Sequence, residues 1–156
     1  MASSVNPIPD SYRRITPAVV VNGAAKAIEF YSEVFGATER MRYPGPGDTI
    51  AHAELQIGDS VIIVEDEMPG STKAPPAGGL EGSPSFLFIY VEDVDAVIDQ
   101  AVKLGAKLVR APEDQFYGDR DGYVIDPFGH GWTIASHVED VSEEEMMARM
   151  AKMFGG

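Results

Sequence analysis

The sequence contains one structural unit twice, and the second copy begins seventy residues after the first. From residue 21 the chain reads VNGAAKAIEFYSEVFGA, and from residue 91 it reads VEDVDAVIDQAVKLGA. One deletion aligns Gly36 with Gly105. In each copy an apolar strand leads into an amphipathic helix that ends at Gly-Ala, where a left-handed C-cap favours glycine.

Each copy is predicted to be a half-domain, because a unit of this length that occurs only twice cannot bury the apolar face of its sheet alone. The predicted fold class is therefore α+β: two tandem βαβββ modules form curved mixed sheets around a cleft, and a short C-terminal helix follows. In the first module we expect strands at 15–21, 38–43, 49–56 and 60–65, and a helix at 24–35. In the second we expect strands at 85–91, 107–111, 122–125 and 131–137, and a helix at 94–104.

The chain is expected to divide into five segments. They are a flexible N-terminus (1–12), the first module (13–67), a Gly/Pro-rich linker (68–84), the second module (85–140) and a C-terminal helix (141–156). In the last segment Ser142 and Glu145 fit a capping box. The methionines of this helix share one face, which suits either an adaptable lid or dimer contact, or packing against the protein's own surface. These methionines are Met146, Met150 and Met153.

Composition limits the classes of function. The 156 residues include no cysteine, which excludes disulfides and thiolate metal sites. The N-terminus does not read as a signal peptide, and no apolar run approaches membrane-spanning length, so a cytoplasmic protein without a membrane partner is expected. The net charge of −13 disfavours nucleic-acid binding. It favours either attraction of cationic ligands or simple solubility.

Two stretches carry a resemblance to a known family. AAKAIEFYSEVFGA and the turn DPFGHGW resemble the vicinal-oxygen-chelate superfamily, which includes glyoxalase I, extradiol dioxygenases and bleomycin-resistance proteins. HAELQIGDSVIIVEDE and FYGDRDGYVIDPFGHGWTIASHVED are similar to its PhnB-like branch. The resemblance implies the doubled βαβββ fold and a homodimer, and it leaves the activity open, because one scaffold hosts many functions.

The resemblance also indicates where catalytic members of the superfamily hold a metal. Those places fall on Thr16, Ile62 or Ile63, Phe86 and Thr133. A divalent cation needs three or four N or O ligands that converge on one point. These residues cannot supply them, so we expect no metal and no cofactor. A shift of register could bring in Glu65 and His137, but the other two strands would still contribute no ligand.

An aromatic row takes the place of ligands on the fifth strand. Alternation puts Phe86, Phe88 and Tyr90 on the face that lines the predicted cleft, and Thr16 on the matching face of the first strand. The row could stack a planar ligand, or its rings could simply fill the cleft.

His52 is the strongest polar candidate. It alternates with apolar residues together with Glu54, so both are expected to point into the cleft, where they could act as acid and base or anchor a ligand. A structural histidine is the alternative. A seventy-one-residue offset matches His52 with Tyr123 in the second module. Tyr117 could border the mouth of the cleft, and Thr133 completes the predicted set.

Three hypotheses of function remain. The first is a metal-free protein that binds and sequesters a small aromatic or cationic compound, as in antibiotic resistance. The second is a lyase or isomerase of the superfamily that uses His52 and Glu54, or an atypical metal site. The third is an interaction or regulatory protein with a filled cleft.

Overall fold

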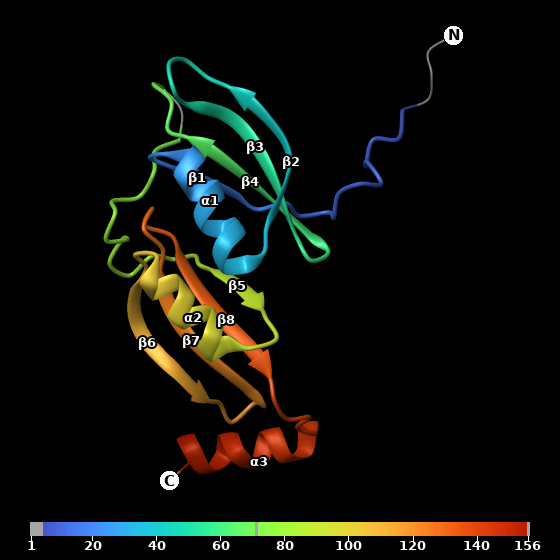
Figure 1. The fold of residues 1–156 in the computed structure, drawn as a ribbon. Coiled ribbons are helices and arrows are strands. Elements are labelled where there is room, and N and C mark those ends of the chain that lie inside the picture. Colours follow the sequence, from blue (N-terminus) through green and yellow to red (C-terminus); the bar gives the residue numbers. More distant parts are fainter. Residues whose placement is uncertain (1–4, 71, 156) are drawn as a thin grey trace. The chain divides into compact units, whose positions relative to one another are not determined.

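The computed structural model describes residues 5–70 and 72–155 as two compact units. Unit 1 ends at Pro75 and unit 2 begins at Pro76, inside the predicted linker. Each unit contains one four-stranded mixed sheet and one helix packed on it (Figure 1), and a third helix ends the chain. The predicted α+β class with two βαβββ modules is confirmed.

Unit 1 is built in the order strand, helix and three strands. Its elements are β1 (Ala18–Val21), α1 (Ala24–Phe35), β2 (Thr38–Pro44), β3 (Ile50–Ile57) and β4 (Ser60–Asp66). The strand order in the sheet is β1-β4-β3-β2. β1 pairs parallel with β4, and the other pairs are antiparallel.

Unit 2 repeats this arrangement. Its elements are β5 (Leu87–Tyr90), α2 (Val94–Lys103), β6 (Lys107–Asp114), β7 (Asp119–Ile125), β8 (Gly131–His137) and the terminal α3 (Glu143–Phe154). The strand order is β5-β8-β7-β6, again with one parallel pair, β5 with β8.

The first strand of each unit is shorter than predicted. β1 starts at Ala18 and β5 at Leu87, so Thr16 and Phe86 precede their strands. Pro17 explains the late start of β1, because proline has no N–H to donate to a ladder. β6 and β7 are longer than predicted. β6 continues past Pro112, which an irregular edge strand tolerates.

α1 ends at Phe35 as predicted, and α2 ends at Lys103, one residue before its predicted end. Gly36 caps α1 with φ +66°, and Gly105 follows α2 with φ +103°. Only glycine adopts this left-handed conformation without a steric penalty.

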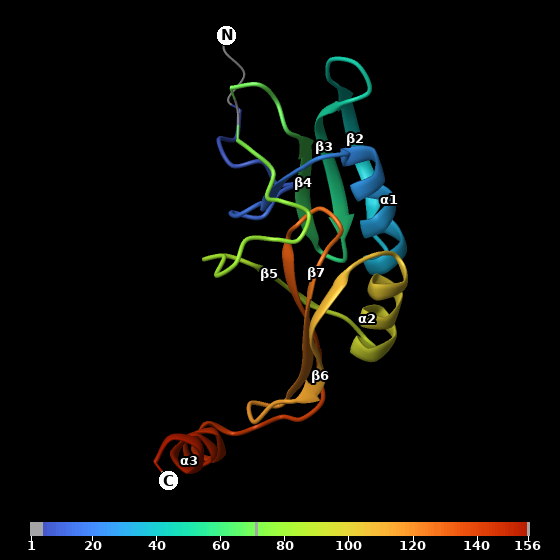
Figure 2. The ribbon, with the colours of Figure 1, turned by 90° about the vertical axis from the view of Figure 1, so that its left-hand side faces the viewer.

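Each sheet has one face covered by its helix and one face that the helix leaves open. In unit 1 the helix side carries Val19, Val21, Ala53 and Leu55, all buried, and Figure 2 shows α1 on that side of the first sheet. In unit 2 the helix side includes the buried Trp132, as expected for a core residue. We call the opposite side of each sheet its open face.

The C-terminal helix begins as predicted, and one of its side chains contacts the rest of unit 2. Ser142 accepts a hydrogen bond from the N–H of Glu145, which confirms the cap. No residue of α3 is buried, but Met146 is half-buried, and neither interpretation of the methionine face is decided. Arg149 ties the helix to Glu139 and to the carbonyl of Phe116.

None of the helices in the described residues is long and apolar enough to cross a membrane.

Candidate functional site

A histidine stands between two carboxylates on the open face of unit 1. His52 and Glu54 project from β3 and Glu65 from β4. Nδ1 of His52 lies 3.1 Å from Oε1 of Glu65, and its Nε2 lies 3.2 Å from Oε1 of Glu54. The predicted proximity of His52 and Glu54 is therefore present, and Glu65 joins them.

Glu54 is the buried centre of this group, only 4% exposed although it lies on the open face. The hydroxyl of Tyr12 donates to its two carboxylate oxygens, at 2.8 and 2.9 Å. Nη1 of Arg40 lies 3.6 Å from Oε2 of Glu54, and the Arg40 guanidinium sits over the Tyr12 ring, 4.8 Å from its centre. These contacts replace the interactions with water that the carboxylate loses on burial.

The two carboxylates raise the pKa of His52 above its ordinary value, and the hydrogen bond to Glu65 is the largest cause. Protonated imidazole donates from both nitrogens, so the charged form satisfies both acceptors at once. Such an imidazole can orient a ligand by donating a hydrogen bond or can act as a general acid.

Three aromatic side chains stand exposed on the open face of unit 2. Phe86, Phe88 and Tyr90 are 58%, 48% and 61% exposed. The rings of Phe88 and Tyr90 lie 5.1 Å apart between centres, and Phe86 meets Tyr123 edge-on at 6.1 Å. Within unit 2 the row is therefore an accessible aromatic surface and not part of the core.

A second histidine between two carboxylates lies beside this row. Asp119, 4% exposed, accepts hydrogen bonds from the Tyr90 hydroxyl at 2.7 Å and from Nδ1 of His137 at 2.8 Å. Nε2 of His137 lies 2.8 Å from Asp140. Asp119 is the largest cause of the raised pKa of His137. Both units thus combine a tyrosine hydroxyl, a buried carboxylate and a bridged histidine on their open faces.

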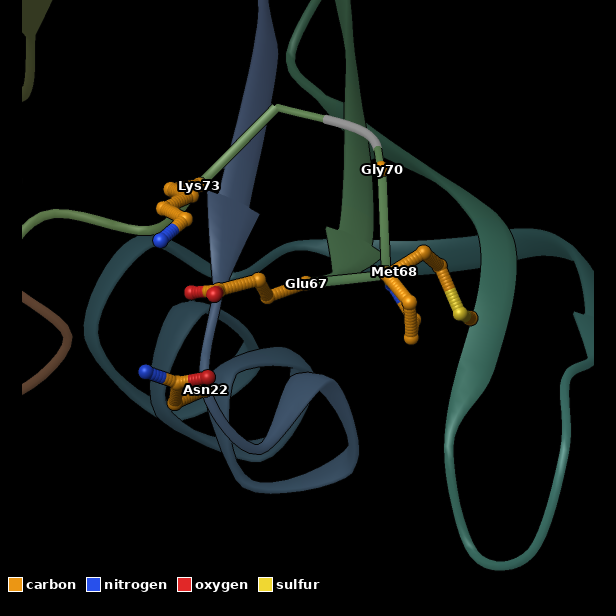
Figure 3. A pocket seen from close by; sticks show the side chains of 6 residues that line it. Asn22, Glu67, Met68, Gly70 and Lys73 are labelled. Atoms are coloured by element: carbon orange, nitrogen blue, oxygen red, sulfur yellow. The ribbon is translucent and has the colours of Figure 1, made fainter.

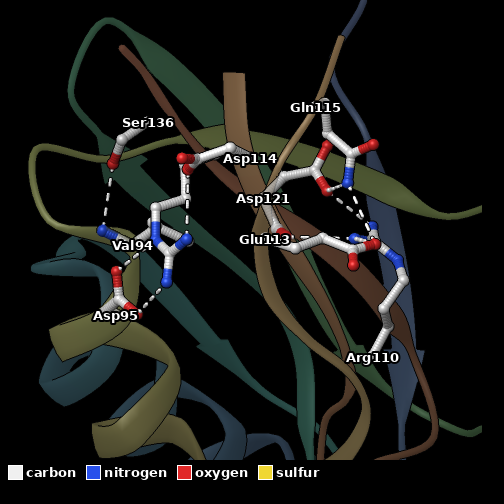
Figure 4. Close-up of polar contacts among 9 residues, drawn as sticks. Val94, Asp95, Arg110, Glu113, Asp114, Gln115, Asp121 and Ser136 are labelled. Atoms are coloured by element: carbon white, nitrogen blue, oxygen red, sulfur yellow. Dashed lines mark hydrogen bonds and ion pairs between the residues drawn. The ribbon is translucent and has the colours of Figure 1, made fainter. Parts of the chain in front are cut away.

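Tyr117 is engaged inside unit 2. Its hydroxyl donates to the buried Asp121. Arg110 pairs with the same carboxylate at 2.7 Å, as Figure 4 shows. Burial, helped by this hydrogen bond, raises the pKa of Tyr117 to about 12. Tyr117 is therefore a neutral hydrogen-bond donor that holds Asp121 in place, and its place at the mouth of a cleft stays a prediction.

The places where the superfamily holds a metal do not fit one here. On the open faces they carry Thr16, Ile63, Phe86 and Thr133, which offer two hydroxyls and no imidazole or carboxylate. No cluster of histidine and acidic side chains among the described residues could hold a metal ion. In unit 1 the ring of His52 stands between its two carboxylates, so their oxygens cannot converge with one of its nitrogens on a single ion.

The strand register identifies equivalent positions in the two units. Ala18 of β1 pairs with Ile63, and Phe88 of β5 pairs with Thr133. Because the repeat aligns Ala18 with Phe88, Ile63 and Thr133 occupy the same place in their sheets.

The predicted match between His52 and Tyr123 is wrong by two residues. Ile63 pairs with Glu54, and its counterpart Thr133 pairs with Tyr123. Tyr123 is therefore the counterpart of Glu54.

Loop length explains this error. In unit 1 a two-residue turn, Gly58 and Asp59, joins β3 to β4, whereas residues 126–130 join β7 to β8. The longer loop shifts the numbering of β7, and the counterpart of His52 is Asp121.

A pocket of about 450 Å³ opens in unit 1 where the chain leaves β1 and β4 (Figure 3). It is lined by Asn22, Glu67, Met68, Pro69, Gly70 and Lys73. Its lining combines polar side chains with Met68 and Pro69, and it contains none of the predicted site residues.

Several residues of the two clusters were not predicted. Asp119 and Asp121 alternate with Tyr123 as His52 alternates with Glu54, and this period-two pattern was a usable signal for a polar open face. Tyr12 and Arg40 carry no such signal, because Tyr12 precedes any regular element and Arg40 falls at a register irregularity of β2.

Comparison with known proteins agrees with this architecture. The model of the glyoxalase/bleomycin resistance protein/dioxygenase superfamily matches residues 14–134. An uncharacterized protein of Mycobacterium tuberculosis is 39% identical over 146 residues, covering 91% of this chain and 85% of its own.

Solved structures show the same fold. TioX from Micromonospora sp. ML1 is 26% identical with a TM-score of 0.57, covering 80% of this chain and 99% of its own. A PhnB protein from Bacillus cereus is 18% identical with a TM-score of 0.59, covering 80% and 99%. At that identity the second likeness concerns the fold alone.

Proposed function

Because the chain belongs to the glyoxalase/bleomycin resistance protein/dioxygenase superfamily, we propose that it is a metal-free protein that binds a small aromatic or cationic compound. The observation that carries the proposal is the exposed row of Phe86, Phe88 and Tyr90 on the open face of unit 2. Exposed aromatic side chains that line up on one face of a sheet are typical of binding surfaces.

The polar groups beside the row suit the charged end of such a compound. Asp140 is fully exposed and Asp119 lies beneath Tyr90. A cationic group placed over the Tyr90 ring would gain a cation–π interaction and the attraction of both carboxylates. The net charge of −13 draws cations toward the protein in addition.

The open face of unit 1 offers a polar anchor of its own, His52 with Glu54. A protonated His52 would donate a hydrogen bond to a carbonyl or hydroxyl oxygen of a ligand. Thr16 adds a hydroxyl to the proposed contacts of unit 1, and Thr133 and Tyr123 add theirs to the proposed contacts of unit 2.

A thermal-shift screen with metabolites and antibiotics tests the proposal, because a ligand bound only by the folded state raises its stability. Phe88→Ala should weaken binding of the compound found by about 1–3 kcal/mol, as expected for a lost aromatic contact. Phe154→Ala, which removes an exposed ring from α3, is the matched control. Equal affinity in the wild type and Phe88→Ala would refute the proposed binding surface.

The proposed biological role is sequestration, as in antibiotic resistance. If an antibiotic is the compound found, expression of the wild type in a susceptible bacterium should raise the inhibitory concentration, and expression of Phe88→Ala should raise it less.

A second candidate is an acid–base enzyme at His52, which its position between Glu54 and Glu65 favours. Such an enzyme would exchange a carbon-bound proton of its substrate with solvent. Incubation of the compound found with protein in deuterated water, followed by mass spectrometry, decides between the two. Deuterium uptake that His52→Gln abolishes would support the enzyme, and no uptake supports the binding protein.

We also propose that the protein forms a homodimer. β1 and β5 are four-residue edge strands with one side unpaired in their own sheets. Another copy could cover such edges. A monomeric mass by light scattering at micromolar concentration would refute this part of the proposal.

A further inference from the structure

We propose that the open face of unit 1 is a binding site for neutral phenols, and that Tyr12 of the protein's own N-terminal segment occupies it as an internal ligand. The inference does not depend on the aromatic row of unit 2. It rests on how Tyr12 is held and on how little else holds the segment that carries it.

Tyr12 is contacted as a bound phenol would be. Its hydroxyl donates to both oxygens of Glu54, at 2.8 and 2.9 Å, and this carboxylate is 4% exposed. Hydrogen bonds from a neutral donor to a buried carboxylate are among the stronger ones in proteins. The Arg40 guanidinium lies 4.8 Å from the ring centre, as in a cation–π contact.

The site is assembled without the N-terminal segment. Glu54 lies on β3, and Arg40 lies on β2 next to it. His52 holds the Glu54 carboxylate from the other side, at 3.2 Å. Among the described residues, Nη1 of Arg40 makes no hydrogen bond, and it lies 3.6 Å from Oε2 of Glu54. Removal of Tyr12 would therefore leave a shaped recess with a carboxylate at its base.

The segment itself is weakly attached. Residues 5–17 belong to no helix or strand. Among the described residues of this segment, Tyr12 bonds to Glu54 of the sheet, and Arg13 bonds to Asp59 in the turn between β3 and β4. The carbonyl of Pro17, where the segment enters β1, accepts the N–H of Ile63. The Arg13–Asp59 pair is 68% and 81% exposed, and such pairs contribute little. A phenol in solution therefore competes mainly with one side chain.

The geometry selects the class of ligand. A neutral phenol supplies the O–H that Glu54 accepts and the ring that Arg40 covers. A phenolate or a carboxylate would face the buried negative charge of Glu54 and be repelled. Toluene would supply the ring but not the hydroxyl donor, so the buried Glu54 would keep His52 and lose one hydrogen bond, which is costly for a buried carboxylate.

The experiment measures binding of p-cresol and toluene to the wild type, Tyr12→Ala and Ile15→Ala by calorimetry. Tyr12→Ala should bind p-cresol at least about tenfold more tightly than the wild type, the loss of one competing contact. Ile15→Ala changes an exposed neighbour and should behave as the wild type. Glu54→Gln in the Tyr12→Ala protein should remove most of the gain. Circular dichroism checks that each variant is folded.

A measurement on the wild type covers the case in which Tyr12→Ala does not fold. Trypsin cleaves after Arg13 and Arg14, both exposed in the segment that Tyr12 anchors. If p-cresol displaces Tyr12, it should speed this cleavage, whereas toluene should not.

Three results would overturn the proposal. They are equal p-cresol affinity in the wild type and Tyr12→Ala, equal binding of toluene and p-cresol by Tyr12→Ala, and, if that variant does not fold, a cleavage rate in the wild type that p-cresol leaves unchanged. The first would mean that Tyr12 has a structural role only.

Discussion

Asp66 in unit 1 and Ser136 in unit 2 occupy the same position relative to their helices. Oδ1 of Asp66 accepts the N–H groups of Gly23 and Ala24, at 2.8 and 2.9 Å. Oγ of Ser136 accepts the N–H of Val94 at 3.0 Å. The first N–H groups of a helix have no acceptor within the helix, so the neighbouring strand supplies one in both units.

The two side chains should differ in their effect on stability. Oδ2 of Asp66 also accepts the N–H of Ile50 at 2.7 Å, so Asp66→Ala leaves three backbone donors without this partner. We expect Asp66→Ala to lower the free energy of unfolding by about 2–4 kcal/mol and Ser136→Ala by about 1 kcal/mol. Urea unfolding followed by circular dichroism measures both.

Asp59→Ala is the control for this comparison, because Asp59 is exposed and lies in a turn. It should change the free energy of unfolding by less than about 0.5 kcal/mol. If Ser136→Ala lowered the free energy of unfolding more than Asp66→Ala, this would contradict the larger role expected for the Asp66 hydrogen bonds.

The fold could be predicted because its signals are local and occur twice. The 3.6-residue pattern and the capping glycine fixed α1 at both ends, and alternation placed Val19 and Val21 under the helix. The register of β7 could not be predicted, because it depends on the length of the loop before β8. The alignment of Gly58 with Gly129 did not reveal that this loop is longer than the turn between β3 and β4.

The candidate site was only partly predictable for the same physical reason. Alternation along one strand brought His52 and Glu54 together, but Tyr12 reaches Glu54 from forty-two positions away in the chain. Such a contact forms only in the tertiary fold, so it leaves no periodic pattern in the sequence. Asp119 and Asp121 precede the strand predicted at 122–125, yet their partners from other elements allow them to be buried within β7.

Glu65→Gln should lower the pKa of His52 toward its ordinary value, because Glu65 is the largest cause of its rise. Titration of the imidazole signals by NMR measures this shift. The pKa of His137 is an internal control, since Asp119 and Asp140 raise it, and it should stay unchanged. If the pKa values of His52 and His137 fell by the same amount, the cause would be the change in net charge and not the loss of the contact with Glu65.

The raised pKa of His52 also predicts a pH dependence of stability. The folded state binds the proton more tightly than the unfolded state, so the contribution is fully present below the unfolded pKa of about 6.5. It is lost as the pH rises through the raised pKa of the folded state. His52→Gln should therefore reduce the fall in unfolding free energy above about pH 6.5, measured by urea unfolding at a series of pH values.

The protein purified without chelator should contain no stoichiometric transition metal, because Thr16, Ile63, Phe86 and Thr133 stand where the superfamily keeps its ligands. Elemental analysis by plasma mass spectrometry measures the content. A value of about one zinc, nickel, iron or manganese per chain would contradict the prediction. Loss of that metal in His52→Gln or His137→Gln would then identify the ligands.

Gly131→Ala should destabilise unit 2 through one specific clash. A Cβ at this position would lie 1.9 Å from the hydroxyl oxygen of Tyr123 and 2.7 Å from Cζ of its ring. The Tyr123 ring, which meets Phe86 edge-on, would have to move. We expect a loss of about 1–3 kcal/mol in the free energy of unfolding, the usual cost of overpacking.

A double-mutant cycle isolates this clash from other effects of the added methyl group. In a Tyr123→Ala background the space beside Gly131 is free, so Gly131→Ala should cost less than about 0.5 kcal/mol there. The difference between the two costs is the energy of the contact between residues 123 and 131. Equal costs in both backgrounds would mean that the Tyr123 ring does not lie against Gly131. The open face of unit 2 would then have a different shape beside Phe86, where the proposed ligand binds.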